Sequence, residues 1–131
     1  STQMGSYERP RFSAAQMKIA EIYRDGLKDR QAALQAFRRV YTDHPTSVLR
    51  DDAMWAEATM LREDKKLGEA CDVVQKLAKQ LPESRYARCV KAACPNEKVD
   101  TPVKQNCPDY ILRELEHPKG ANGDSENDTS E

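Results

Sequence analysis

The sequence is poor in the residues on which sheet-based folds and nucleic-acid binders rely. Aromatic residues make up 6% of its 131 positions, and five positions are glycine. Charged residues reach 33% against 38% hydrophobic residues, a balance that favours helices with one buried face over layered sheets. Basic residues number 21 and acidic residues 22, so the net charge of −1 excludes the strongly basic surface that is typical of nucleic-acid binding.

Long apolar runs and enzyme motifs are also missing. No stretch approaches the ~20 apolar residues of a membrane-spanning helix, so we expect no direct membrane insertion. The patterns GxGxxG, HExxH and GxSxG are absent, as are a phosphate-binding loop and an EF-hand loop. We therefore predict a protein that is not an enzyme and that needs no cofactor or metal ion. No signal peptide is recognisable and the chain starts at Ser1, so we expect a mature or excised segment.

What remains is a series of amphipathic segments separated by proline and glycine. "SAAQ" at 13–16 has the form of a capping box, and Gly26 is a typical helix stop. Pro45 and Pro82 end two further segments, because the residue before a proline is pushed out of the helical region. The predicted helices span about 13–26, 29–43, 67–81, 84–94 and 109–115, and a further helix that carries Leu61 begins at Ser47 or Asp51.

These segments divide the chain into four predicted parts. A flexible leader at 1–12 precedes helical repeats with a cap at 13–94. A proline-rich loop and a short last helix follow at 95–117. Residues 118–131 are rich in Gly, Asn, Ser and acidic side chains, a composition that predicts disorder.

One stretch of the chain recurs. "AALQAFRRVYTDHPTS" at 32–47 is followed 37 residues later by "EACDVVQKLAKQLPES" at 69–84. A fixed period between about 20 and 50 residues is typical of stacked helical arrays. A third copy begins at Ser84, but Pro95 cuts it short, so 84–94 is predicted to be a capping helix. The matched pairs are Ala33 and Ala70, Phe37 and Val74, Val40 and Leu77, Pro45 and Pro82, and Ser47 and Ser84.

The order alanine, large apolar, apolar and proline in these stretches resembles the second helix of a tetratricopeptide repeat. Met54, Ala58 and Leu61 stand where that family places the packing residues of its first helix. Glu57 stands at a position that is usually apolar. The resemblance covers about 13–94 and implies an all-α fold: a short right-handed α-solenoid of about two helix hairpins plus a truncated capping helix.

Two details of the resemblance concern the period. In the first repeat, Ile19, Ala20 and Tyr23 fit the packing positions only with a one-residue insertion near "RDGLKD". The long period and the "P-x-S" between repeats resemble the subclass found in bacterial envelope proteins, such as the outer-membrane assembly lipoprotein and the coordinator of the Tol–Pal system. This resemblance implies a periplasmic or envelope-associated location.

In the tetratricopeptide family, the first helix of each repeat lines a groove that holds a protein or peptide partner. Trp55 is the chain's one tryptophan, and Trp and Arg are common binding hot spots. The alternative is that Trp55 fills the core, as a single tryptophan at helical spacing often does. The resemblance assigns partner binding to Met17, Glu21 and Arg24 in the first repeat, and to Asp52, Trp55, Thr59 and Arg62 in the second.

The four cysteines gather around the short third repeat. Neither a CxxC pair nor a CxxCH motif occurs, which disfavours a redox pair, a zinc knuckle and covalent haem attachment. An even count predicts two disulfides. An antiparallel arrangement of 67–81 and 84–94 favours Cys71–Cys94 with Cys89–Cys107, while Cys71–Cys89 with Cys94–Cys107 stays open. Buried free thiols in a reducing cytosol are the other alternative.

We therefore predict a non-catalytic interaction module or scaffold, with a protein or peptide partner, within a bacterial envelope complex. A second hypothesis is a metal-binding or redox protein that uses the four cysteines. A third is a cytosolic co-chaperone with a basic clamp for a carboxylate, based on Arg24 and Arg62. The sequence does not indicate the oligomeric state.

Overall fold

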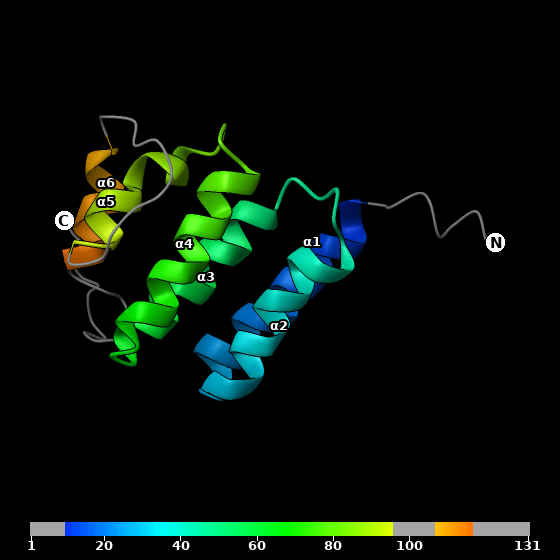
Figure 1. Cartoon of the computed structure of the whole chain (residues 1–131). Helices are drawn as coiled ribbons and strands as arrows, with labels where there is room; N and C mark the ends of the chain where they lie inside the picture. Colours follow the sequence, from blue (N-terminus) through cyan, green and yellow to red (C-terminus); the bar gives the residue numbers. More distant parts are fainter. Residues whose placement is uncertain (1–9, 96–106, 117–131) are drawn as a thin grey trace. The chain divides into compact units, whose positions relative to one another are not determined.

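The computed structural model describes residues 10–95 and 107–116, and every regular element in these ranges is helical. The predicted all-α fold class is confirmed. The described residues form two compact units that divide inside α3, between Glu57 and Ala58. The elements, shown in Figure 1, are α1 (Pro10–Glu21), the π-helix η2 (Ile22–Gly26), α2 (Arg30–Asp43), α3 (Arg50–Glu63), α4 (Leu67–Gln80), the 3₁₀-helix η3 (Arg85–Cys89), α5 (Val90–Ala93) and α6 (Asp109–Glu116).

In the first unit, α1 and η2 pack against α2 (Figure 1). Small residues allow this close approach, because Ala20 and Ala33 are both completely buried. Phe37 and Val40 of α2 are also completely buried, as the repeat pattern predicts. Asp29 begins α2 by accepting a hydrogen bond from the backbone N–H of Ala32 at 3.1 Å, which satisfies one of the unpaired donors of the first turn.

In the second unit, α4 packs against η3 and α5, and α6 contacts η3. These short elements cover the apolar side of α4, which carries the buried residues Val74 and Leu77. Ile111 of α6 is completely buried as well. The expected short third copy and last helix are therefore present, and they form one cap over α4 together. The predicted disordered tail at 118–131 and most of the proline-rich loop lie outside the described residues.

The 37-residue period holds at the level of individual backbone angles. α2 and α4 each contain 14 residues and start 37 positions apart. Lys28 and Lys65, also 37 apart, both have positive φ, of 56° and 68°. The serines at the end of each repeat, Ser47 and Ser84, both accept a hydrogen bond from the backbone N–H two residues later, at 2.9 and 3.1 Å. The two hairpins therefore share turn geometry as well as apolar spacing.

The insertion expected near "RDGLKD" corresponds to a π-helical turn. In η2 the backbone N–H of Leu27 donates to the carbonyl of Ile22 at 2.9 Å, which is the i to i+5 pattern of a π-helix. A π-turn takes one residue more than an α-turn, so η2 accommodates the extra residue without ending the helix. The first helical segment of repeat one therefore runs on to Gly26.

Two local expectations for the first repeat are wrong. α1 begins at Pro10, so Ser13 lies inside the helix and does not cap it. Its buried hydroxyl instead accepts a 2.8 Å hydrogen bond from Ser47. The helix does end at Gly26, as expected, and the residue with left-handed backbone that follows it is Lys28. Ile19, expected among the packing residues, is 45% exposed.

We predict that Lys65→Gly stabilises the protein. A left-handed conformation costs a residue with a Cβ atom about 1–2 kcal/mol, and glycine avoids this cost at some loss of unfolded-state entropy. The expected net gain in the free energy of unfolding is about 0.5–1 kcal/mol, measured by urea denaturation. Lys66→Gly is the matched control, because Lys66 has a φ of −98° and gains nothing from glycine. A loss of stability in Lys65→Gly equal to that in the control contradicts the prediction.

Candidate functional site

Three of the predicted binding residues lie on one side of α1 and η2. Met17, Glu21 and Arg24 follow a spacing of four and three residues, and all three are half-buried. Glu21 lies 3.8 Å from the ammonium of Lys18. Arg24 makes two hydrogen bonds to the carboxylate of Asp25, at 2.8 and 2.9 Å. Its guanidinium also lies 5.2 Å from the ring centroid of Phe37, so Arg24 is held by its own unit.

The four remaining predicted residues follow one side of α3, with spacings of three, four and three. Asp52, Thr59 and Arg62 are half-buried. Trp55 is only 4% exposed, so its indole contributes to the core and offers little surface to a partner. This burial agrees with the core alternative for Trp55, because a large aromatic ring gains more free energy from burial than from a place at the surface.

Arg62 has a structural contact that the sequence pattern did not indicate. Its guanidinium donates a 3.2 Å hydrogen bond to the carbonyl of Ala93, the last residue of α5. The carbonyls of a final helical turn lack partners within the helix, and a cation there also compensates the helix dipole. Arg62 therefore fixes the end of α5 within the second unit.

A polar cluster, which we call the Glu57 cluster, lies between α2 and α3. Glu57 is 1% exposed, and both of its carboxylate oxygens accept hydrogen bonds. The guanidinium of Arg38 donates to one oxygen from Nε at 3.0 Å and also from a terminal nitrogen. The hydroxyl of Tyr41 donates to the other oxygen. A buried carboxylate is tolerated only when it is paired in this way.

The cluster also shifts the ionisation of its members. Burial raises the pKa of Tyr41 well above its usual range, and the hydrogen bond to the Glu57 carboxylate raises it further. The same carboxylate raises the pKa of Arg38 through a hydrogen bond and through its charge. Tyr41 therefore remains a neutral donor and Arg38 a cation at physiological pH. Both oxygens of the buried carboxylate are bonded within the cluster, so we interpret the cluster as a structural feature that holds α2 and α3 together at Glu57.

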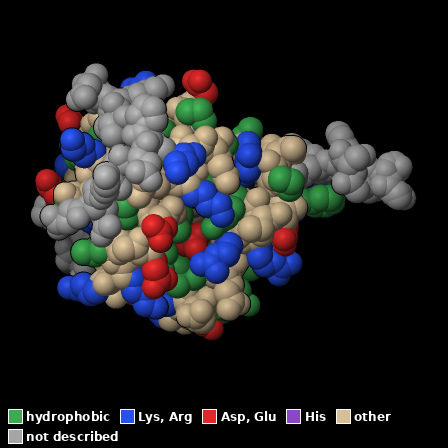
Figure 2. All heavy atoms as spheres, viewed as in Figure 1, with side chains coloured by type: hydrophobic (Ala, Val, Ile, Leu, Met, Phe, Trp, Pro, Cys, Tyr) green, Lys and Arg blue, Asp and Glu red, His purple; other side chains and the backbone are tan. Residues whose placement is uncertain are grey.

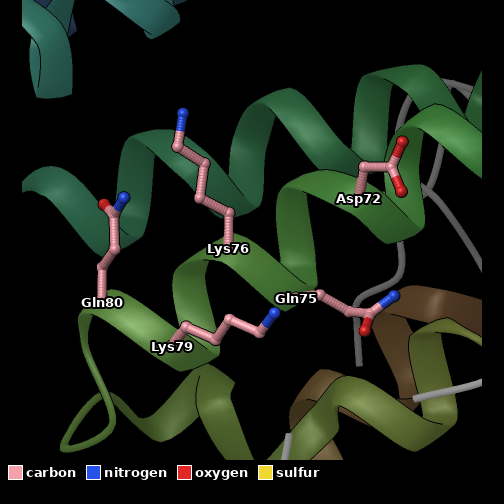
Figure 3. Close-up of a pocket in the computed structure, with 5 residues that line it drawn as sticks. All are labelled: Asp72, Gln75, Lys76, Lys79 and Gln80. Carbon is pink, nitrogen blue, oxygen red and sulfur yellow. The ribbon is translucent and has the colours of Figure 1, made fainter. Parts of the chain in front are cut away.

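A hollow of 360 Å³ lies along the outer face of α4 and is open to solvent. Figure 3 shows that its five lining side chains all project from this one helix. The lining is polar and of mixed charge, without the apolar anchors of a small-molecule site. Basic and acidic side chains are likewise interspersed on the face of the molecule in Figure 2. The lining residues are Asp72, Gln75, Lys76, Lys79 and Gln80.

Two disulfides join the elements of the second unit. Cys71 of α4 is bonded to Cys94 with a Cα–Cα distance of 5.4 Å, and Cys89 of η3 to Cys107 with 4.9 Å. These are the pairs that the antiparallel helices favour. All four cysteines are used, which leaves no thiolate for a metal site. Within the described ranges, no group of three or more His, Cys, Asp and Glu side chains is placed to hold a metal ion.

Among residues 10–95 and 107–116, no helix has both the length and the apolar character that crossing a bilayer requires.

We predict that Glu57→Ala lowers the free energy of unfolding by about 2–3 kcal/mol, because Tyr41 loses a buried acceptor and Arg38 its charge partner. Glu57→Gln keeps an acceptor for Tyr41 and should lose less. Asp43→Asn is the control, since Asp43 forms an exposed ion pair with Arg39 at 2.9 Å and its loss should not be measurable. Urea denaturation at neutral pH distinguishes the three variants. Equal stability of Glu57→Ala and Asp43→Asn contradicts the structural role.

One comparison with known proteins gave a result. A family model described as "Tetratricopeptide repeat" matches residues 14–47, which cover most of α1, all of η2 and α2, and the turn up to Ser47. The comparisons with curated proteins and with solved structures gave no match. Tetratricopeptide repeats generally mediate contacts between proteins. The protein is therefore tetratricopeptide-repeat-like, with its first hairpin similar to that family and its second related to the first by the 37-residue period.

Proposed function

We propose that the protein is a non-catalytic interaction module that holds a protein or peptide partner on the first helices of its two repeats. The observation that carries this proposal is the similarity of 14–47 to a tetratricopeptide repeat. The matching turn angles of the second hairpin support the view that it is a repeat of the same kind. Two repeats offer a short surface, so we expect a short partner segment or a modest affinity.

We further propose that only part of the predicted set contacts the partner. Met17, Asp52 and Thr59 are members of the predicted set that are partly accessible, and we assign partner binding to them. Arg24 and Arg62 already bind groups of their own unit, which argues against the basic clamp of a co-chaperone. Trp55 is buried and is better assigned to packing.

Site-specific photo-crosslinking tests the binding surface. A photoreactive amino acid replaces Met17 or Thr59 in the full chain, and Gln80 on the outer face of α4 serves as the exposed control. After irradiation in the native host, we expect one shared adduct from Met17 and Thr59 and none from Gln80, because only the first helices contact the partner. An adduct of equal yield from Gln80, or none from Met17 and Thr59, overturns the assignment.

We also propose that the protein works in an oxidising compartment, as part of a bacterial envelope complex. Disulfides persist in such compartments and are rare in the cytosol. Cys71, Cys89 and Cys94 are buried in the second unit, each exposing no more than 2% of its surface, so both bonds form part of its core. The envelope context rests on the long period and the cysteines.

We predict that the native protein, alkylated without reductant, shows no alkylated thiol by intact mass, and four after reduction under denaturing conditions. Each disulfide closes a loop, of 23 and 18 residues in sequence separation. Replacing Cys71 and Cys94 together by alanine should lower the free energy of unfolding by about 2–4 kcal/mol. Four alkylated thiols in the unreduced native protein would remove the compartment proposal and leave the crosslinking test of binding unaffected.

A further inference from the structure

A row of apolar side chains lies exposed along the flank of α1. We call it the α1 stripe, and its spacing of three, four and three residues keeps it on one side of the helix. Ile22 continues the row at the start of η2, and three of the members are large and 45–49% exposed. The buried residues Ser13 and Ala20 lie on the opposite side of α1. The members of the stripe are Phe12, Ala15, Ile19 and Ile22.

In the second repeat, the side chains at the corresponding positions are buried. η2 accommodates one extra residue. Positions of the first helix up to Ile22 therefore correspond to positions of α3 that lie 38 residues later, instead of 37. Ala15, Ile19 and Ile22 then correspond to Ala53, Glu57 and Met60, which are buried with at most 1% exposure. Glu57, the counterpart of Ile19, is contacted by Arg38 and Tyr41 of α2. At Glu57, the second helix of the preceding repeat therefore covers this flank in repeat two.

No described element takes that position on α1, where the stripe is exposed. In the second repeat, α2 contacts α3 at Glu57. A helix that contacts α1 in the same way would bury the α1 stripe. The counterpart of Glu57 is the apolar Ile19, so the covering helix needs apolar side chains where α2 has Arg38 and Tyr41. Helices pack by fitting such rows of side chains into one another.

The charges beside the stripe specify the partner further. Arg11 and Lys18, seven residues apart, follow the same edge of α1, and both are exposed. Glu21 lies 3.8 Å from Lys18 and only partly balances these two cations. We infer that the α1 stripe is a docking surface for an amphipathic helix of another protein, with an apolar row and acidic side chains along one edge. This surface is separate from the proposed groove residue Met17.

A second copy of the chain fits this surface less well. In an antiparallel two-fold pairing of two α1 helices, the same edges of both helices fall together. Arg11 and Lys18 of one copy would then face those of the other, and like charges repel. Electrostatic complementarity favours an acidic partner.

The test uses two synthetic amphipathic helices of about 18 residues with the same leucine row. One carries glutamate along one edge of that row and the other carries lysine. We expect the glutamate peptide to bind the full chain and the lysine peptide to bind at least about fivefold more weakly, by isothermal titration. In Ile19→Gln the affinity for the glutamate peptide should fall about tenfold or more. Leu67→Gln, which changes a residue 50% exposed at the start of α4, is the matched control and should bind normally.

Three results overturn this inference. Equal affinity for both peptides, or equal losses in Ile19→Gln and Leu67→Gln, shows that the stripe does not select a partner. Light scattering tests whether a second copy of the chain binds the stripe. A dimer that forms as the concentration rises and is lost in Ile19→Gln would assign the stripe to self-association instead. Crosslinking from Met17 should persist in Ile19→Gln, so failure at the stripe and failure at the proposed groove are distinguishable.

Discussion

A single hairpin of two short helices cannot bury its own apolar face, and the rest of this structure follows from the need to cover it. The first hairpin packs through small residues that bring its helices close, such as Ala20 on α1 and Ala33 on α2. That packing leaves the outer flank of each first helix to be covered by something else. On α3 the side chains of α2 cover it at Glu57. On α1 the flank is exposed, and on α4 the cap covers the remaining apolar side.

Glu57 shows how a charged residue is retained at a position where packing favours an apolar one. Taking a carboxylate out of water costs several kcal/mol unless charge and hydrogen bonds compensate for the lost hydration. Arg38 and Tyr41 supply both, and Arg38 keeps half of its side chain in solvent, which limits the cost to its own charge. A buried ion pair often stabilises less than apolar residues of the same size. The hydrogen bonds of Glu57 are directional, so they form in only one register of α2 against α3. An apolar contact at this position would allow several registers.

Much of the fold could be predicted from the sequence because the relevant signals are local or periodic. The 37-residue offset made it possible to predict the positions of α2 and α4, because a proline follows both segments and the apolar spacing indicates the buried side. Other features depend on contacts that sequence does not record. Ser13 looks like a cap, but its partner is Ser47, far along the chain. The π-turn could be predicted only as an insertion, because sequence gives its length and not its geometry.

The candidate site was harder to predict for a related reason. A pattern of three and four residues gives one side of a helix, but not whether that side faces a partner or the core. Trp55 has the residue type of a hot spot, yet it is buried. Arg62 has the type and spacing of a binding residue, yet it holds the carbonyl of Ala93. In both cases the same physical property, a large surface or a permanent charge, serves the fold and binding equally well.

The cap connects the fold to the environment in which the protein is stable. α6 has eight residues, and an isolated helix needs about 12–15 to be even marginally stable in water. Its own burial rests mainly on Ile111 and Leu115. The bond from Cys107 to Cys89 holds the start of α6 beside η3, so these two side chains reach their place without a large loss of chain entropy. Without that bond, α6 must be held by two side chains alone. The cap is therefore most stable on α4 when the bond between Cys89 and Cys107 is intact.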